Sequence, residues 1–306
     1  MNKIYTTILI SALTIIPILT YADTRWSEGD GEHTSKPHVE YETGTNILLV
    51  SDQTDGVDTP EYFDAYYISA LDWHNVNYTY WDHDTYGSPQ LEDLEPYGLI
   101  IWFTGNSGQY SSDIPYYGHI TLTLEEEQTL FSYLTTLEGD RGVLLSGMWV
   151  AWNCVADAST QSQTYSPLFS HLLSLDYPQD NFTDWIEVDD DWTLDSEQSS
   201  PIYKADTITI DWKSSQNYPD MLESMVDGGD AKWYDGGEYH HYACIHNEGE
   251  KLMGGKYRIA LMSCPFEAIG TSEERFTVMG DILDWYKIPS VSIETESIGT
   301  IKTIFR

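Results

Sequence analysis

The sequence predicts an α/β fold with a mostly parallel sheet, helices on both faces, and an antiparallel β-rich extension in the second half. Three continuous apolar segments, 47–50, 99–103 and 143–145, are typical of strands buried on both faces. Helical patterns alternate with these segments, which is the order of a parallel sheet covered by helices. From residue 181, short alternating segments between acidic and Gly-rich turns predict the antiparallel extension.

The first elements follow from local signals. A strand at 47–50 precedes a helix in which Thr59 is the N-cap and Pro60 the first residue. Two further strands are expected at 78–81 and 99–103. The apolar stripe of the helix contains Phe63, Tyr66, Tyr67, Ala70 and Leu71.

A capping box of Thr123 and Glu126 predicts the start of the next helix, and Gly139 is placed to end it. A strand at 143–145 and a short helix over 166–173, opened by a Ser-Pro pair, come next. The buried face of the longer helix consists of Leu130, Phe131, Leu134 and Leu137.

The second half ends in a helix that a second capping box, Thr271 and Glu274, predicts. Before it, further strands are expected over 182–188, 206–212, 238–246 and 257–263. The last helix buries Phe276, Met279, Ile282, Leu283 and Tyr286.

Residues 1–22 have the pattern of a secretory signal peptide. Lys3 provides positive charge, 8–19 is an apolar stretch, and a Thr-Tyr-Ala sequence offers small residues for cleavage. The stretch is shorter than the roughly 20 residues of a spanning helix, which favours cleavage over a retained membrane anchor. We expect a secreted, extracellular or periplasmic protein without a stable membrane span after cleavage.

The predicted domain organisation follows from changes in composition. Residues 23–45 are polar and aperiodic and predict a flexible linker. The folded domain is expected over 46–287, with a β-rich insertion at about 181–250. Residues 288–306 form a C-terminal tail.

The chain is strongly acidic, with 50 Asp and Glu residues, 14 Lys and Arg residues, and a formal net charge of −36. Such a surface repels phosphate groups, which excludes nucleic acid as a partner. Aromatic residues make up 14% of the chain, which excludes a disordered acidic protein.

Three cysteines are too few for a disulfide scaffold. Cys244 and Cys264 could pair across an antiparallel hairpin that turns near Gly254-Gly255. Cys154 would then remain a buried thiol. This pairing is a hypothesis.

Aspartates gather after the first two strands. Asp52, Asp55 and Asp58 follow the first strand at three-residue intervals, and Asp82 and Asp84 follow the second. Neighbouring parallel strands would bring the two loops to one edge of the sheet, and calcium prefers such oxygen ligands. Calcium is therefore the candidate cofactor, with the simpler alternative that these residues form turns.

Several segments together resemble the class I glutamine-amidotransferase-like modules of secreted and cell-surface bacterial proteins. They are NILLVSDQTDGVDTPEYF, YTYWDHDTYGSPQLEDLEPYGLIIWFTGNSG, LTLEEEQTLFSYL, GVLLSG and KYRIALMSCPFEAIG. The resemblance covers roughly residues 46–287 and implies a flavodoxin-like, Rossmann-type α/β fold.

The chain departs from this family at its catalytic positions. Active members carry a cysteine in a G-x-C-x-G turn after the fourth strand, where this chain has SGMWVA and places Met148. A thioether cannot ionise, so it cannot attack a carbonyl. The family's His-x-Glu segment corresponds best to Cys264–Glu267, which keeps Glu267 and lacks the histidine. The resemblance therefore implies a non-catalytic member.

Ligands of open parallel sheets bind beyond the carboxyl ends of the strands, and these loops are the predicted site. The favoured function is a non-catalytic module that recognises an extracellular protein, peptide or glycan there. The alternatives are a secreted hydrolase that uses acidic residues, with or without a metal, and a structural envelope protein. The candidate ligand-binding residues are Asp52, Thr104, Gly105, Asn106, Met148, Trp149 and Glu267.

Other nucleophiles and bases are weaker candidates. Cys154 has the simpler interpretation of a buried apolar side chain, and Ser146 lacks a G-x-S-x-G frame. The period of a strand places His240, Tyr242, Cys244 and His246 on one face. That face could bind zinc or supply a base, although a solvated face explains it more simply. A pair of carboxylates for glycoside hydrolysis also stays open in so acidic a chain.

Overall fold

The computed structural model describes residues 46–53, 63–105, 121–147, 150–157, 162–163, 166–176, 193–197, 200–204, 207–211, 220, 222–226, 228–234 and 239–289. All of them belong to one compact unit, His38–Arg306. The predicted signal peptide, the linker and most of the predicted tail lie outside the described residues, so these assignments stay predictions.

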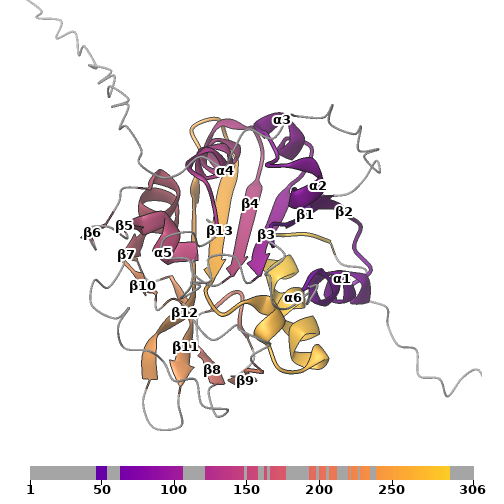
Figure 1. The fold of residues 1–306 in the computed structure, drawn as a ribbon, viewed down its shortest axis with the longest axis vertical. Coiled ribbons are helices and arrows are strands. Elements are labelled where there is room, and N and C mark those ends of the chain that lie inside the picture. Colours follow the sequence, from indigo (N-terminus) through magenta and orange to yellow (C-terminus); the bar gives the residue numbers. More distant parts are fainter. Residues whose placement is uncertain are drawn as a thin grey trace, which may run out of the picture. The chain divides into compact units, whose positions relative to one another are not determined.

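Within the described residues, a nine-stranded sheet has the order β2-β1-β3-β4-β13-β12-β11-β8-β9 (Figure 1). Its first five strands pair in parallel. They are β2 (Tyr78–Asp82), β1 (Ile47–Ser51), β3 (Leu99–Gly105), β4 (Arg141–Gly147) and β13 (Lys256–Met262). The parallel core is the one that the buried apolar segments predict.

The other four strands extend the sheet in antiparallel pairing. They are β12 (Tyr239–Glu250), β11 (Gly229–Tyr234), β8 (Thr193–Ser196) and β9 (Thr207–Thr209). The predicted α/β fold with an antiparallel extension is thus confirmed. Two small two-stranded sheets pair β7 (Leu175–Asp176) with β10 (Glu223–Ser224) and β5 (Ala156–Asp157) with β6 (Ser162–Gln163). The predicted strand at 182–188 lies outside the described residues.

The two faces of the sheet bury separate apolar clusters, because successive side chains of a strand point to opposite sides. On one face, Leu49 and Ile101 pack with α1 (Asp64–Trp73) and α6 (Ser272–Trp285). We call this the α1/α6 face. On the opposite α4 face, Leu48 and Ile100 pack with other helices. These are α3 (Leu91–Leu94), α4 (Leu124–Thr136), α5 (Val150–Val155) and the π-helix η1 (Pro167–Leu173).

Both predicted capping boxes are confirmed. Thr123 Oγ1 accepts a hydrogen bond from Glu126 N, while the Glu126 side chain accepts one from Thr123 N. Thr271 and Glu274 make the same exchange at the start of α6. The predicted start of α1 lies outside the described residues, but Phe63, Tyr67, Ala70 and Leu71 are buried as expected. The remaining short helices are α2 (His83–Tyr86) and the 3-10 helix η2 (Phe266–Ala268).

The predicted pairing of Cys244 with Cys264 is wrong, since all three cysteines are buried thiols outside any disulfide. Cys244 lies opposite Met262 on β13, and its thiol donates to Asp230 at 3.7 Å. Burial raises the pKa of both the Cys244 and the Cys264 thiols. They are packed as apolar core residues. Cys154 is a buried thiol, as expected.

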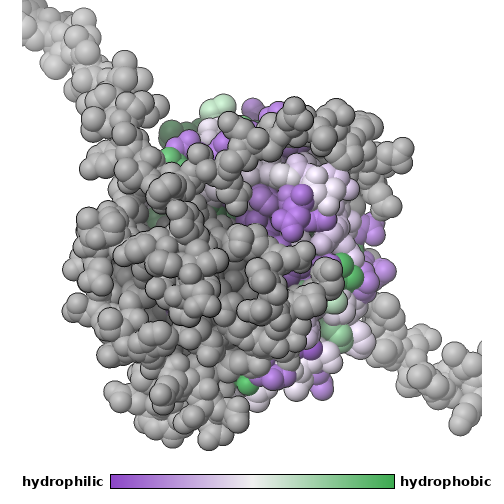
Figure 2. Space-filling model, viewed as in Figure 1, coloured by the Kyte–Doolittle hydropathy of each residue, from purple (hydrophilic) through white to green (hydrophobic). Residues whose placement is uncertain are grey.

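Hydrophilic residues dominate the surface that Figure 2 shows in colour, with a few separate apolar residues among them. In the described part of the chain, no helix has the length and apolar character needed to cross a lipid bilayer.

Candidate functional site

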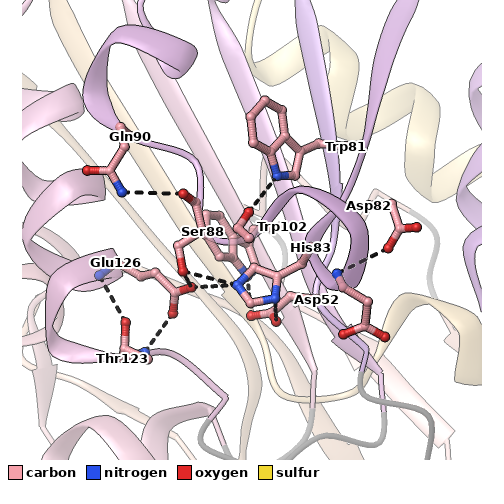
Figure 3. A network of polar contacts seen from close by, with 11 residues as sticks. Asp52, Trp81, Asp82, His83, Ser88, Gln90, Trp102, Thr123 and Glu126 are labelled. Atoms are coloured by element: carbon pink, nitrogen blue, oxygen red, sulfur yellow. Dashed lines mark hydrogen bonds and ion pairs between the residues drawn. The ribbon is translucent and has the colours of Figure 1, made fainter. Parts of the chain in front are cut away.

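Three ionisable side chains converge on the α4 face at the carboxyl ends of β1 and β2 (Figure 3). Asp52 follows β1, His83 begins α2 directly after β2, and Glu126 lies in the first turn of α4. His83 Nδ1 lies 3.2 Å from Asp52 Oδ1, and His83 Nε2 lies 2.9 Å from Glu126 Oε1. The imidazole therefore bridges two carboxylates from different elements. We call these residues the Asp–His–Glu cluster.

Each carboxylate of the cluster is fixed through its other oxygen. Trp102 Nε1 donates to Asp52 Oδ2 at 2.9 Å, and Thr123 N donates to Glu126 Oε2 at 2.7 Å. Trp102 reaches Asp52 because its side chain points from β3 to the α4 face of the sheet. The contact between Thr123 and Glu126 is part of the capping box. As a result, Asp52 Oδ1 and Glu126 Oε1 both face His83.

The cluster is largely withdrawn from water. Asp52 and Glu126 are 7% and 2% exposed, and the His83 side chain is 16% exposed. Burial raises the pKa of Glu126, but hydrogen bonds from His83 and Ser88 outweigh burial and hold this pKa below its ordinary value. A protonated imidazole can donate to both carboxylates at once.

Ser88 completes the network. The contacts then run from Ser88 to His83 and on to Asp52, as in a Ser-His-Asp triad. Ser88 Oγ lies 3.1 Å from His83 Nε2, and His83 Nδ1 faces Asp52. In a triad, however, the serine proton goes to the imidazole. Here Ser88 Oγ donates to Glu126 Oε1 at 2.6 Å, and His83 Nε2 contacts the same oxygen. Ser88 therefore donates to a carboxylate instead of to the imidazole, and the arrangement does not activate it as a nucleophile.

A second polar network lies on the α1/α6 face. Tyr67 Oη lies 2.8 Å from both Ser146 Oγ and Glu267 Oε2, and Phe266 N donates to Ser146 Oγ at 3.0 Å. Tyr67, Ser146 and Glu267 are fully buried. Burial, assisted by the Glu267 carboxylate, raises the pKa of the Tyr67 phenol. The sheet therefore separates Glu267 from Asp52, although both belong to the predicted ligand site.

The turn after β4 is followed by a helix that is already capped. Met148 and Trp149 lie outside the described residues, and α5 begins at Val150. The Asp220 carboxylate accepts a hydrogen bond from Ala151 N at 2.8 Å. Ser263 Oγ donates a hydrogen bond to the backbone carbonyl oxygen of Asp220 at 2.6 Å. An internal carboxylate therefore occupies a backbone donor at the start of α5.

Thr104 and Gly105 end β3 beside Asp52. The sheet order places β1 between β2 and β3, so the carboxyl ends of β1 and β3 form the switch point where ligands bind in such sheets. Asp52 N donates to Phe103 O at 2.9 Å across this point. The Thr104 hydroxyl is buried and, within the described structure, has no hydrogen-bond partner. Gly105 adopts a positive φ of 53°, which favours glycine.

The aspartates predicted to bind calcium do not form one group in the described structure. Asp82 caps α2, accepting hydrogen bonds from Asp84 N at 3.2 Å and Thr85 Oγ1 at 2.6 Å. Asp84 is exposed. Asp55, Asp58 and the ligand candidate Asn106 lie outside the described residues.

The prediction that His240, Tyr242, Cys244 and His246 share one face of a strand is wrong in part for β12. Cys244 pairs with Ala231 and Tyr242 with Lys232, so β12 carries an extra residue opposite β11. This bulge turns Tyr242 toward the α4 face, whereas Cys244 packs on the α1/α6 face. His246 Nδ1 lies 2.8 Å from the fully buried Asp230 carboxylate. His246 is thus a partnered residue; the side chain of His240 lies outside the described part of the structure.

Sequence reasoning missed His83, Glu126, Asp220 and Asp230 as site residues. His83 follows the second strand directly, which is a usable signal for a histidine at the carboxyl edge. Glu126 carries no such signal, because its position is fully explained by the capping box. The two aspartates belong to the extension, whose pairing no local pattern predicts.

Comparison with known proteins gives distant fold similarity. Neither a protein-family model nor a curated protein sequence matches the chain. Among solved structures, the chain is similar to the N-terminal domain of mmIFT52, with a TM-score of 0.40 and 11% identity, over 80% of this chain and 99% of that one. It is also similar to a protein of Bacteroides uniformis described as ThuA-like, with a TM-score of 0.35 and 12% identity, over 82% and 95% of the two chains.

Proposed function

We propose that the chain is an exported, non-catalytic module that binds a protein, peptide or glycan at the carboxyl edge of its parallel strands. The main support for the proposal is that the predicted site residues lie on opposite faces of the sheet. Cys264 and Glu267, at the positions that resemble the family's His-x-Glu segment, are fully buried on the α1/α6 face, while Asp52 and Thr104 lie at the switch point.

Acyl transfer needs a nucleophile, a base and donors for the oxyanion. Met148 supplies no nucleophile, and the buried Cys264 thiol has a raised pKa because of burial and the neighbouring Glu267 carboxylate. Glu267 itself is fully buried against Tyr67. Asp220 already accepts from the start of α5. These contacts support loss of the reaction.

Binding is supported by the Thr104 hydroxyl. A buried hydroxyl that makes no hydrogen bond costs free energy, and such groups are uncommon in native proteins. A ligand that reaches the switch point can satisfy this hydroxyl. The strongly negative chain favours neutral or basic ligands over acidic ones.

The binding half of the proposal is tested with a glycan microarray and a displayed peptide library as probes. Thr104→Val removes the hydroxyl without losing an internal hydrogen bond, so it should not lower stability. We expect about three- to tenfold weaker binding of the selected probe, the effect of one hydrogen bond. The control, Thr207→Val, changes an exposed threonine of β9 and should bind like wild type. Equal affinity of Thr104→Val and wild type, or no selected probe, contradicts the proposal.

The catalytic half is tested by incubating the purified chain with L-glutamine and with a panel of ester, peptide and glycoside substrates. We expect no turnover. Turnover that disappears in Asp52→Asn and persists in the control Asp84→Asn would establish the alternative, a hydrolase that uses acidic residues.

A further inference from the structure

We propose that Asp52, His83 and Glu126 form a binding site for one first-row divalent transition metal ion, with zinc as the representative ion. Each residue offers one ligand atom, and these three atoms lie within 4.8 Å of one another. The inference concerns the α4 face and does not depend on the ligand proposed for the switch point.

The donor atoms decide the class of metal. One imidazole nitrogen with two carboxylate oxygens is a usual set for zinc, manganese or iron, whereas calcium and magnesium prefer oxygen ligands alone. The cluster shares one residue, Asp52, with the calcium group expected from the sequence. It adds a histidine and a glutamate from α2 and α4.

The spacing suits direct coordination. Bonds of about 2.0–2.2 Å to a common zinc ion place neighbouring ligand atoms roughly 3–4 Å apart. The 3.2 Å contact to Asp52 and the 2.9 Å contact to Glu126 involve different nitrogens of the His83 ring. A metal bound at one ring nitrogen is therefore next to one carboxylate, and the other carboxylate must turn to reach it, from a ligand atom that lies within 4.8 Å. The ring nitrogen that binds the metal gives it a lone pair, and the other ring nitrogen keeps its proton.

The surroundings hold the ligands in place before a metal arrives. Trp102 fixes Asp52, and the capping box fixes Glu126, in each case through the oxygen that faces away from His83. Ser88 Oγ contacts both Glu126 and His83. Outer contacts of this kind orient ligands and strengthen metal binding. The partial exposure of His83 leaves a route from solvent and room for a water ligand.

The test is calorimetric titration of zinc chloride into the full chain after treatment with EDTA and dialysis. We expect one site that is lost in His83→Gln and in Glu126→Gln. His246→Gln is the matched control, because His246 is also a partly buried histidine beside a buried carboxylate, and it should keep the site. Trp102→Phe should weaken binding by about tenfold or more. Millimolar calcium should not compete.

A second measurement needs no variant. X-ray absorption at the zinc edge of the loaded wild-type chain should give oxygen and nitrogen neighbours with one imidazole and no sulfur. The proposal is overturned if zinc does not bind, if His83→Gln binds zinc as well as wild type, or if sulfur coordinates the metal. The binding of glycan or peptide probes is tested with Thr104→Val, whereas the binding of zinc is tested with variants of His83 and Glu126. Failure of one proposal can therefore be told apart from failure of the other.

Discussion

Tyr67→Phe removes one oxygen from the interior of the α1/α6 face and keeps the aromatic ring. The ring stacks on Phe103 with centroids 4.2 Å apart and packs on Phe266, and both contacts are available to phenylalanine. The hydroxyl lies 2.8 Å from Ser146 Oγ and from Glu267 Oε2, and all three side chains are fully buried. The substitution therefore tests the hydrogen bonds with little change in packing.

The expected cost follows from the loss of a buried hydrogen bond to a carboxylate, about 1.5–3 kcal/mol of unfolding free energy. In a domain of this size, 1 kcal/mol corresponds to roughly 2–4 °C in Tm. The matched control is Tyr78→Phe, whose hydroxyl lies 3.4 Å from Asp72 Oδ1 on the surface. It should change stability by less than about 0.5 kcal/mol.

Urea unfolding followed by far-UV circular dichroism measures both variants against wild type. The buried variant should unfold at a clearly lower urea concentration than the control, with the same slope. If Tyr67→Phe and Tyr78→Phe have the same stability, the Tyr67 hydroxyl does not stabilise the buried carboxylate of Glu267, and the proposed loss of acyl transfer loses one of its supports.

Three further predictions use the same purified chain. A Cβ on Gly147 would lie 1.9 Å from Thr104 Oγ1, so Gly147→Ala should cost about 1–3 kcal/mol in urea unfolding, whereas Gly98→Ala, with its nearest contact at 3.7 Å, should match wild type. Burial raises the pKa of Glu274, but hydrogen bonds, the largest from Thr209 N, outweigh it and keep this pKa below its ordinary value. The stability that Glu274 contributes is therefore fully present above the pKa that it has in the unfolded chain. It is lost as the pH falls through the lower pKa that Glu274 has in the folded chain. Glu274→Gln should cost about 0.5–1 kcal/mol at neutral pH, and its urea midpoint should converge with wild type in acid. Thiol titration should find three thiols in the denatured, unreduced chain and none reactive in the native chain, because all three cysteines are buried thiols; a single thiol would restore the disulfide.

The elements of the fold could be predicted because their signals are local. A run such as 99–103 is apolar across its width and therefore belongs in the middle of a sheet. The Thr271–Glu274 pair specifies a helix start within four residues. Such signals need no knowledge of distant partners.

The site could be predicted less well because its contacts join distant parts of the chain. His83 and Glu126 are 43 residues apart, and Trp102 and Asp52 are 50 residues apart. The alternation of strands also fails at a bulge, since one extra residue in β12 moves Tyr242 to the other face. Glu267 follows β13 in the chain, yet the packing of η2 against Tyr67 places its carboxylate on the face opposite Asp52.

The position of β13 has a consequence for how the protein folds. This strand pairs with β4 on one side and β12 on the other, so it joins the parallel and antiparallel parts of the sheet. It is also the last strand in the described chain, and it meets β4 across more than a hundred intervening residues. Contacts over such long stretches form slowly. Until 256–262 has joined the sheet, β4 and β12 each lack one of the neighbours that they have in the folded protein, and unpaired strand edges of this kind are prone to aggregate.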